Sequence, residues 1–448
     1  MRKVGFITLT VAFLLFLSVI PVSGTSWETP INITNDTTPQ QYSVSLTVDS
    51  DGIVHIAWST ASSIGFPQFG KIYYTNNSGG SFNTPVLIPS PVNQSVAPSL
   101  AVDSSGNAHI AFFGGNRSVG SSSTPKTDIY YSTNKGPSGN FQTINLTDYN
   151  AGITRPPDLA LDSNGYAHIV WRDEVGDIRY GNNTGGTFGN EKATNENGSP
   201  IFFNPSLALD NSDKPHVVCW ATDLNDFELF YTTKGAVGAA WLSLIAVTND
   251  PISATERIDD QFPDISVDNG LVHIAWKRSF LQSAVSRMLL TPRNTFTANS
   301  THIFYTNGSI NGFQTLVQVS SVGNWHTAPS LALDSADNAH ITWKNSTSYP
   351  YPFLYSNNTS GNFGSPETLP VSSDPNGNPS IFVDSDNYIH IAFSGFITGT
   401  YLDVIYLKSG DASVPVSEFI GQLLPLVILA WFATLVIGIR IAKKKRIS

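Results

Sequence analysis

Short runs in which apolar and polar residues alternate recur along most of the chain, separated by turn residues. One run reads PSLAVD (98–103), the next reads AHIAF (108–112), and the polar turn SSGN lies between them. A period of two around a short turn predicts a β-hairpin. Each hairpin is followed by an aromatic run such as IYY (129–131), then by a turn and a strand such as FQTINLT (141–147). These four strands, A to D, make one unit.

The unit recurs seven times, and each copy carries an aspartate at the end of strand A and a histidine on strand B. Successive histidines are 48 to 67 residues apart, at or above the spacing of four-stranded propeller blades. The pairs are Asp49/His55, Asp103/His109, Asp162/His168, Asp210/His216, Asp268/His273, Asp334/His340 and Asp384/His390.

The two ends of the repeat array complement each other. The seventh unit stops after strand C at VIYLKSG (404–410), whereas WETPINIT (27–34) reads as a strand D without its own A, B and C. Pairing these two segments would leave no open sheet edge. We therefore predict an all-β chain, a seven-bladed β-propeller of four-stranded blades closed by an N-terminal strand. An open β-solenoid, the alternative, would not need this complementarity.

Two long apolar segments interrupt the alternation. Residues 1–24 have a basic start and small residues before a cleavage point, which predicts a signal peptide or, alternatively, an uncleaved anchor. Residues 419–439 carry no charge and could cross a ~30 Å hydrocarbon layer as one transmembrane helix. The basic tail 440–448 should remain cytoplasmic. This predicts a cell-membrane protein with an extracellular ectodomain (25–410), a linker (411–418) and one C-terminal span.

Composition adds three points. Cys219 is the only cysteine, so no disulfide forms within the chain, and its strand position predicts a core residue. Residues 25–418 hold 17 basic and 34 acidic residues, a net charge of about −17, which argues against a nucleic-acid partner. Glycosylation sequons support an extracellular placement. They begin at Asn32, Asn35, Asn76, Asn93, Asn116, Asn145, Asn182, Asn197, Asn299, Asn307, Asn345, Asn357 and Asn358.

The turn between strands C and D resembles a degenerate Asp-box of the sialidase-like (BNR) repeat propellers. TNNSGGSF (75–82) and GNNTGGTF (181–188) carry Asn77 and Asn183 where that family has aspartate, and SNNTSGNF (356–363) matches less well. The resemblance implies a propeller and says little about activity, because such repeats occur in hydrolases and in non-catalytic proteins. The arginine motif, arginine triad and Tyr–Glu pair of catalytic sialidases have no counterpart here.

The repeated Asp and His residues are interpreted as scaffold. A propeller site is one central pocket, whereas a pair repeated in every unit behaves like a contact that specifies the fold. The aspartate can cap amides of the A–B turn and accept a hydrogen bond from the imidazole. One Asp and one His per blade cannot gather four ligands around a metal, so no metal or other cofactor is expected.

Function is expected on the opposite face, where the B–C and D–A connections vary between units. Six of the eight arginines outside the termini lie in or beside these connections between Arg155 and Arg293, interleaved with acids. Arginine suits carboxylate or sulfate recognition and paired acids suit sugar hydroxyls, the alternative being a solvated rim of ion pairs. The candidate ligand-binding residues are Arg155, Arg172, Asp173, Glu174, Arg257, Asp259, Asp260, Lys277, Arg278, Trp325 and His326.

Two further segments of this face could contribute to a site. In the long insertion 277–301, apolar residues from Phe280 to Leu289 recur at helical spacing, which predicts a short amphipathic helix. This helix would be a lid, a partner surface or packing filler. Trp325 and His326 suggest a sugar platform, with plain packing as the alternative.

The favoured function is a membrane-anchored surface propeller that binds a glycan, cell-envelope polymer or protein. The alternative is a sialidase-like or other glycoside hydrolase, and a third possibility is a structural envelope component. No catalytic residue is identified in the sequence. Two facing acids about 5 to 9.5 Å apart beside an arginine cluster would favour the hydrolase.

Overall fold

The computed structural model describes residues 25–410 apart from twelve segments. These are 35–39, 62–69, 117–126, 148–155, 195–199, 223–225, 237, 251–255, 286–293, 322–324, 375–376 and 398–401. The predicted signal peptide, linker, transmembrane helix and tail lie outside the described residues. Within them, no helix has the length and apolar character needed to span a membrane.

Residues Thr29–Lys408 form one compact unit made of β-sheets. Five sheets have four strands each, and the chain order of their strands is the repeat order of the sequence. They are β2 (Gln40–Val48), β3 (Val54–Ala61), β4 (Ile72–Asn76), β5 (Val86–Leu87); β6 (Gln94–Val102), β7 (Ala108–Gly115), β8 (Thr127–Thr133), β9 (Gln142–Asn145); β10 (Asp158–Leu161), β11 (Ala167–Arg172), β12 (Ile178–Asn182), β13 (Glu191–Lys192); β23 (His326–Leu333), β24 (Ala339–Asn345), β25 (Tyr351–Asn357), β26 (Glu367–Ser373); and β27 (Pro379–Val383), β28 (Ile389–Gly395), β29 (Asp403–Lys408) with β1 (Ile31–Asn32).

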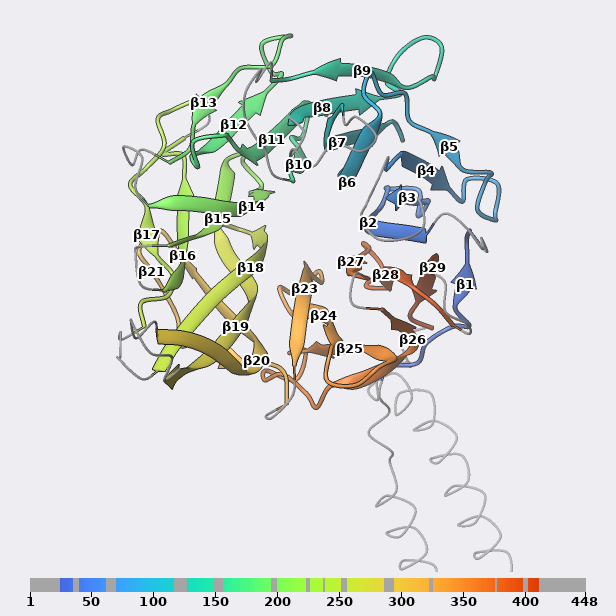
Figure 1. Ribbon diagram of the computed structural model, residues 1–448. Coiled ribbons are helices and arrows are strands. Elements are labelled where there is room, and N and C mark those ends of the chain that lie inside the picture. The colour runs from blue at the N-terminus through green and yellow to red at the C-terminus, as the bar shows by residue number, and fades with distance from the viewer. Residues whose placement is uncertain are drawn as a thin grey trace, which may run out of the picture. The chain divides into compact units, whose positions relative to one another are not determined.

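The sixth sheet has nine strands and contains two successive units of the repeat. One parallel pair, Phe227 with Asp259, joins them. Its strands are β14 (Ile201–Leu209), β15 (Pro215–Thr222), β16 (Phe227–Thr233), β17 (Ile245–Ala246), β18 (Glu256–Asp268), β19 (Leu271–Val285), β20 (Asn294–Ser309), β21 (Gly312–Phe313) and β22 (Val317–Gln318). The sheets stand around a ring with their first strands toward the centre, as in a β-propeller (Figure 1).

The first strands are tied to one another by side chains that occupy the same repeat position. Ser45 accepts a hydrogen bond from the Leu100 amide (3.0 Å), and Asp158 accepts one from the Leu207 amide (2.8 Å). The last such contact runs from the Leu46 amide back to Ser380 (3.1 Å). The residues at this position are Ser45, Ser99, Asp158, Ser206, Asp264, Ser330 and Ser380. A polar belt therefore links neighbouring first strands, including the last to the first.

The predicted pairing of the two chain ends is confirmed. Strand β1 pairs antiparallel with β29, with Ile31 opposite Tyr406. Asp403 accepts hydrogen bonds from the side-chain amide of Asn32 and from the Thr34 hydroxyl, both at 2.8 Å. Because the strand from the start of the unit completes its last sheet, the edge of β29 is covered.

The hydrophobic core lies between neighbouring sheets, and each second strand contributes to two cores. In β11, Val170 packs with Cys219 on one side, whereas Ile169 and Trp171 pack with Ala111 on the other. This is the period of two expected for a strand buried on both faces. Cys219 is fully buried, and burial raises the pKa of its thiol, which confirms the prediction of a core residue.

The helix predicted in the insertion 277–301 is wrong over the described residues. β19 continues as a strand to Val285, and β20 starts at Asn294 and pairs with it from Asn294 onward. The neighbouring strand already presents backbone donors and acceptors, so continuing the ladder satisfies the amides of the insertion without a separate helix. Residues 286–293 of this segment are outside the described residues.

Candidate functional site

The repeated Asp and His residues form a buried contact with a third residue, a tyrosine of strand C. In β11 and β12, His168 Nδ1 lies 2.5 Å from the Tyr180 hydroxyl, and Nε2 lies 3.5 Å from Asp162 Oδ2. Asp162 also accepts hydrogen bonds from the turn amides of Asn164 and Tyr166. All seven histidines contact their tyrosine at 2.5 to 2.7 Å. The pairs are His55/Tyr74, His109/Tyr131, His168/Tyr180, His216/Tyr231, His273/Tyr305, His340/Tyr355 and His390/Tyr406.

His390 shows what the sequence interpretation of these histidines left out. The sequence suggested only the aspartate as the partner of the imidazole, yet His390 Nδ1 lies 2.7 Å from the Tyr406 hydroxyl while Nε2 lies 2.8 Å from Asp384 Oδ2. The aspartate contact also varies between units, because the corresponding distance from His109 to Asp103 is 3.5 Å. The tyrosine is therefore the constant partner, and both ring nitrogens of the buried His390 are engaged within its own unit.

Asp268 and His273 are the exception, because no hydrogen bond or ion pair joins them among the described contacts. Their spacing is five residues instead of six, so the turn is one residue shorter. Asp268 accepts a hydrogen bond from Asn211 of the preceding unit instead. Burial lowers the pKa of His273 to about 4, as it does for His109. Neutral, enclosed imidazoles of this kind support a scaffold role.

The residues after the third histidine divide into structural and exposed groups. Asp173 Oδ1 accepts hydrogen bonds from the amides of Val175, Gly176 and Asp177, and its Oδ2 accepts one from Arg179 Nε at 2.7 Å. Asp173 is therefore a buried turn cap. Glu174 is exposed, Arg172 packs its guanidinium over the Phe203 ring at 4.7 Å, and Arg155 lies outside the described residues.

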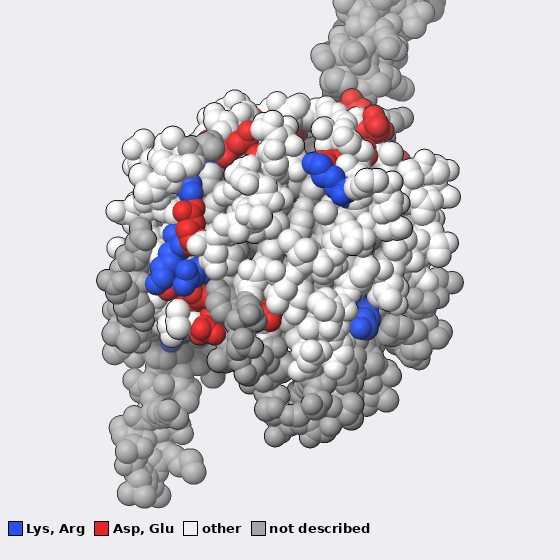
Figure 2. All heavy atoms as spheres, turned by 90° about the horizontal axis from the view of Figure 1, so that it is seen from above, with Lys and Arg blue, Asp and Glu red and all other residues white. Residues whose placement is uncertain are grey.

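Arginine and acid residues in the first part of β18 and the middle of β19 form two separate pairs. Arg257 binds Asp259 through Nε (2.5 Å) and Nη2 (2.7 Å), which is the bidentate geometry of a strong ion pair. Arg278 binds Asp260 through Nε (2.8 Å) and Nη2 (2.7 Å). The space-filling view shows Lys and Arg next to Asp and Glu in one sector of the visible face, while most of that face carries no charge (Figure 2).

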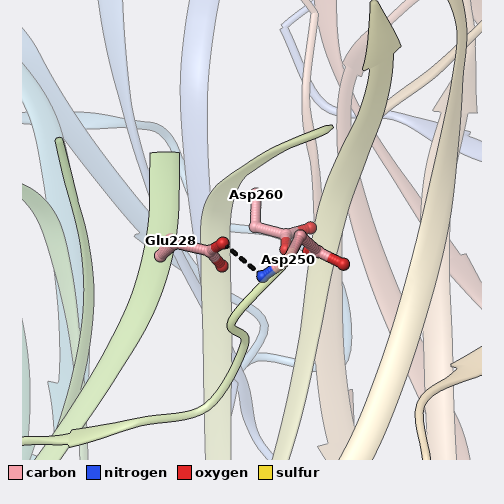
Figure 3. Close-up of side chains that lie close together, drawn as sticks. All are labelled: Glu228, Asp250 and Asp260. Atoms are coloured by element: carbon pink, nitrogen blue, oxygen red, sulfur yellow. Dashed lines mark hydrogen bonds between the residues drawn. The ribbon is translucent and has the colours of Figure 1, made fainter. Parts of the chain in front are cut away.

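Asp260 belongs to a group of three carboxylates that come from three different segments. Glu228 lies in β16, Asp250 follows β17, and Asp260 lies in β18, and one carboxylate oxygen from each lies within 4.8 Å of the others (Figure 3). The Asp250 amide donates to Glu228 Oε1 at 2.7 Å, and Arg278 also binds Asp250. Three oxygens so close could hold a divalent cation, but here the guanidinium supplies positive charge to two of the three.

Sequence reasoning identified Asp260 and Arg278 but missed Glu228 and Asp250. A signal for Glu228 exists, because an acid at the start of strand C bonds to a threonine after strand D in other units as well. Thr147 donates to Asp128, Thr248 to Glu228 and Thr34 to Asp403. Glu228 thus occupies a repeated position, whereas Asp250 stands in a connection without a repeated pattern.

Burial shifts the protonation of this carboxylate group toward the neutral form. Burial raises the pKa of Glu228 to about 7, and the negative charges of Asp260 and Asp250 act in the same direction. The pKa of Asp250 is raised to about 6 by burial, against the opposing effect of Arg278. At neutral pH the group can therefore hold a proton on Glu228, which is the property of a general acid or of a neutral hydrogen-bond donor.

Glu228→Gln is expected to gain stability relative to the natural protein as the pH rises. The folded-state pKa of Glu228 is about 7, above its ordinary value of 4.5. The folded protein therefore holds this proton more tightly than the unfolded chain. The resulting stabilisation is fully present below pH 4.5 and is lost as the pH rises through about 7. Glutamine does not titrate and avoids this loss. Urea unfolding of both proteins at pH 5 and pH 8 measures the change, and an equal difference in stability at both pH values would contradict it.

Trp325 and His326 have different environments. Trp325 is 40% exposed, and its backbone amide donates to Thr347. His326 is fully buried, and its Nδ1 accepts a hydrogen bond from the Trp343 indole at 3.0 Å. Burial lowers the pKa of His326 to about 4. Only Trp325 of this pair is accessible to a ligand, whereas His326 packs in the interior.

Comparisons with known proteins support the fold. No family model and no curated protein matches the chain. Similar solved structures include a protein of unknown function from Dyadobacter fermentans DSM 18053 (TM-score 0.54, 10% identity, covering 86% of this chain and 99% of that chain). They also include an ulvan lyase of family PL25 bound to -[GlcA(1-4)Rha3S]- (0.53, 10%, 85% and 94%) and the polysaccharide lyase Uly1 (0.54, 10%, 86% and 99%). At 10% sequence identity, the structural similarity establishes the fold alone.

Proposed function

We propose that the protein is a membrane-anchored surface propeller that binds a saccharide through the face formed by its B–C and D–A connections. The observation that carries the proposal is the contrast between the two faces. The A–B turns hold the repeated caps, whereas the described unrepeated charged residues Arg257, Asp259, Asp260 and Arg278 gather at the B–C and D–A connections. Unrepeated residues on a repeated scaffold are the expected signature of a binding face.

The proposed propeller has seven blades. The first strands of successive units contact each other in the order β2, β6, β10, β14, β18, β23 and β27, and β27 contacts β2. The nine-stranded sheet counts as two blades joined by a single residue pair. The Asp-box resemblance of the C–D turns agrees with this arrangement.

The anchor and the extracellular side rest on the sequence. The apolar segment 419–439, the basic tail after it and the signal-like residues 1–24 support an ectodomain outside the cell. The sequons support glycosylation of that ectodomain.

A saccharide is favoured over other ligands because sugar recognition combines aromatic and hydrogen-bonding groups, which the variable face offers together. Trp325, which directly precedes β23 in a D–A connection, and Phe262, within β18, are each 40% exposed. The structures of similar fold include proteins described as polysaccharide lyases, one of them with a bound saccharide. These neighbours support a carbohydrate ligand.

Glycoside hydrolysis is the second candidate, and the carboxylate group of Glu228, Asp250 and Asp260 favours it. A carboxyl group with a pKa near 7 suits a general acid. Against it, both Glu228 oxygens already accept hydrogen bonds, from Thr248 and from the Asp250 amide. Asp260 is fully buried and accepts hydrogen bonds from Trp276 and Arg278. Binding without turnover is therefore our first choice.

The test is a saccharide array combined with a hydrolysis screen on the full chain in detergent micelles. We expect at least one saccharide to bind and none to be cleaved. Glu228→Gln serves as the matched variant, since it should leave affinity unchanged. Cleavage that disappears in Glu228→Gln would instead establish the hydrolase, and failure of every saccharide to bind would refute the proposal.

A further inference from the structure

Trp220 stands at the centre of an aromatic cluster at the junction of the two units of the nine-stranded sheet. The Phe203 ring stacks on it at 4.2 Å with an interplanar angle of 14°, and the Phe227 ring meets it edge-on at 4.9 Å. The Phe262 ring lies 6.2 Å away and is 40% exposed. Phe227 belongs to the parallel pair that joins β16 to β18, so strand pairing holds the cluster together.

A cation lies over each of the three phenylalanine rings of this cluster. Arg172 lies 4.7 Å from the Phe203 centroid, Arg257 4.9 Å from that of Phe227, and Lys277 5.1 Å from that of Phe262. Such cation–aromatic pairs hold the charges at fixed positions. The cluster therefore has a fixed apolar surface with positive charges at its margin.

The charges of this margin are only partly compensated. Arg257 is neutralised by its bidentate pair with Asp259. Lys277 has no carboxylate oxygen within 4 Å among the described residues. Burial lowers its pKa, and the negative charge of Asp259 acts in the opposite direction. A half-buried ammonium that lacks a direct carboxylate partner gains more from an added anion than an exposed one, because less water competes.

Trp220 adds a buried hydrogen-bond donor that has no acceptor. The residue is 7% exposed, and its indole nitrogen has no partner among the described residues. By contrast, the indole of Trp58 donates to Gln41 (2.7 Å) and that of Trp276 to Asp260 (2.6 Å). Trp171 shares the unpaired indole but has no described cation over its ring. Leaving such a donor unpaired costs about 1–3 kcal/mol, which an oxygen acceptor would recover.

We propose that this cluster binds an oxyanion, a sulfate ester or a uronate carboxylate, carried by the saccharide ligand. Lys277 and Arg172 supply positive charge, the Trp220 indole donates to an oxyanion oxygen, and the exposed Phe262 ring contacts the apolar face of the sugar. The inference rests on the proposed function and specifies its ligand class. It uses residues apart from the carboxylate group of Glu228, Asp250 and Asp260.

The experiment measures binding of dextran sulfate, oligogalacturonate and unmodified dextran to the full chain in detergent micelles. We expect at least one of the two charged polymers to bind at least about tenfold more tightly than dextran, with affinity falling as salt rises. Lys277→Met should weaken that binding about tenfold and leave dextran unchanged. Lys214→Met, on an A–B turn, is the matched control and should have no effect.

Trp220→Phe keeps the ring and removes the donor, and it should weaken binding of the charged polymer severalfold at an unchanged unfolding midpoint. If the unfolding midpoint of Trp220→Phe falls, the test rests on the Lys277→Met result alone. Preference for dextran sulfate would identify the sulfate ester, and preference for oligogalacturonate the carboxylate. Equal affinity for charged and neutral polymers, or no effect of Lys277→Met, would overturn the inference while the proposed function stands. Binding to no saccharide in the wider array would refute the proposed function as well.

Discussion

Asp260→Ala is expected to lower the free energy of unfolding by about 3–5 kcal/mol, the largest effect of any single substitution considered. Asp260 is fully buried and accepts hydrogen bonds from the Trp276 indole (2.6 Å) and from two nitrogens of Arg278. Alanine would leave a buried guanidinium with Asp250 as its remaining acidic partner and would leave the indole unpaired. Thermal or urea unfolding measures the loss.

Two companion variants show whether the loss comes from the ion pair. Asp386→Ala removes an exposed aspartate of an A–B turn and should change stability by no more than about 0.5 kcal/mol. The double variant Asp260→Ala with Arg278→Met also removes the guanidinium that would be left without Asp260. Its loss in free energy of unfolding should therefore be smaller than the sum of the two single losses. Additive losses, or an Asp260→Ala protein as stable as Asp386→Ala, would contradict this description of the group.

Deletion of residues 29–34 is expected to lower the unfolding midpoint by about 10 °C or more and to cause aggregation. The deletion removes β1, its ladder with β29 and the two hydrogen bonds to Asp403. It leaves the edge of β29 unpaired, and an exposed strand edge recruits other chains. Scanning calorimetry and light scattering measure the two effects.

A peptide with the sequence of residues 27–34 should restore the midpoint of the deleted protein when it is added in trans, because an extended peptide can add a strand to an open edge. A scrambled peptide is the control. A deleted protein that stays monomeric with the natural midpoint would show that β1 does not close the ring.

The architecture was predictable because it is encoded locally and repeatedly. The period of two in segments such as residues 167–171 specifies strands buried on both faces, and Val170 and Trp171 do lie in different cores. The complementarity of the chain ends correctly predicted that the N-terminal strand pairs with the last unit, where Ile31 lies opposite Tyr406. Both inferences needed only residues close in sequence, or a count of units.

Contacts between distant residues were harder to predict. The aromatic runs were recognised as strand C. The register that places Tyr180 opposite Val170, and so brings its hydroxyl to His168, depends on the pairing of β11 with β12. The helical spacing was misleading over the described residues 280–285, because a neighbouring strand can extend its ladder over an apolar segment of either period. The local pattern does not show whether a helix or an extended strand ladder will form.

The candidate site was predicted as a sector but not as a set of contacts. Arg257, Asp259, Asp260 and Arg278 do lie close together, yet they pair among themselves, and Asp173 is a turn cap. The partners that complete the carboxylate group and the Trp220 cluster come from other units. These partners lie close together because β16 pairs with β18, and no sequence pattern predicts that pairing.

The central claim is that the repeated residues build the scaffold and the unrepeated face binds the ligand. It is tested most directly by measuring the unfolding midpoint and saccharide affinity side by side for Tyr180→Phe and Lys277→Met. We predict that Tyr180→Phe, which removes the hydroxyl bound by His168, lowers the midpoint and leaves affinity unchanged, since one hydrogen bond contributes about 1 kcal/mol. Lys277→Met should lower affinity at an unchanged midpoint. The reverse assignment, with affinity lost in Tyr180→Phe and retained in Lys277→Met, would contradict the claim.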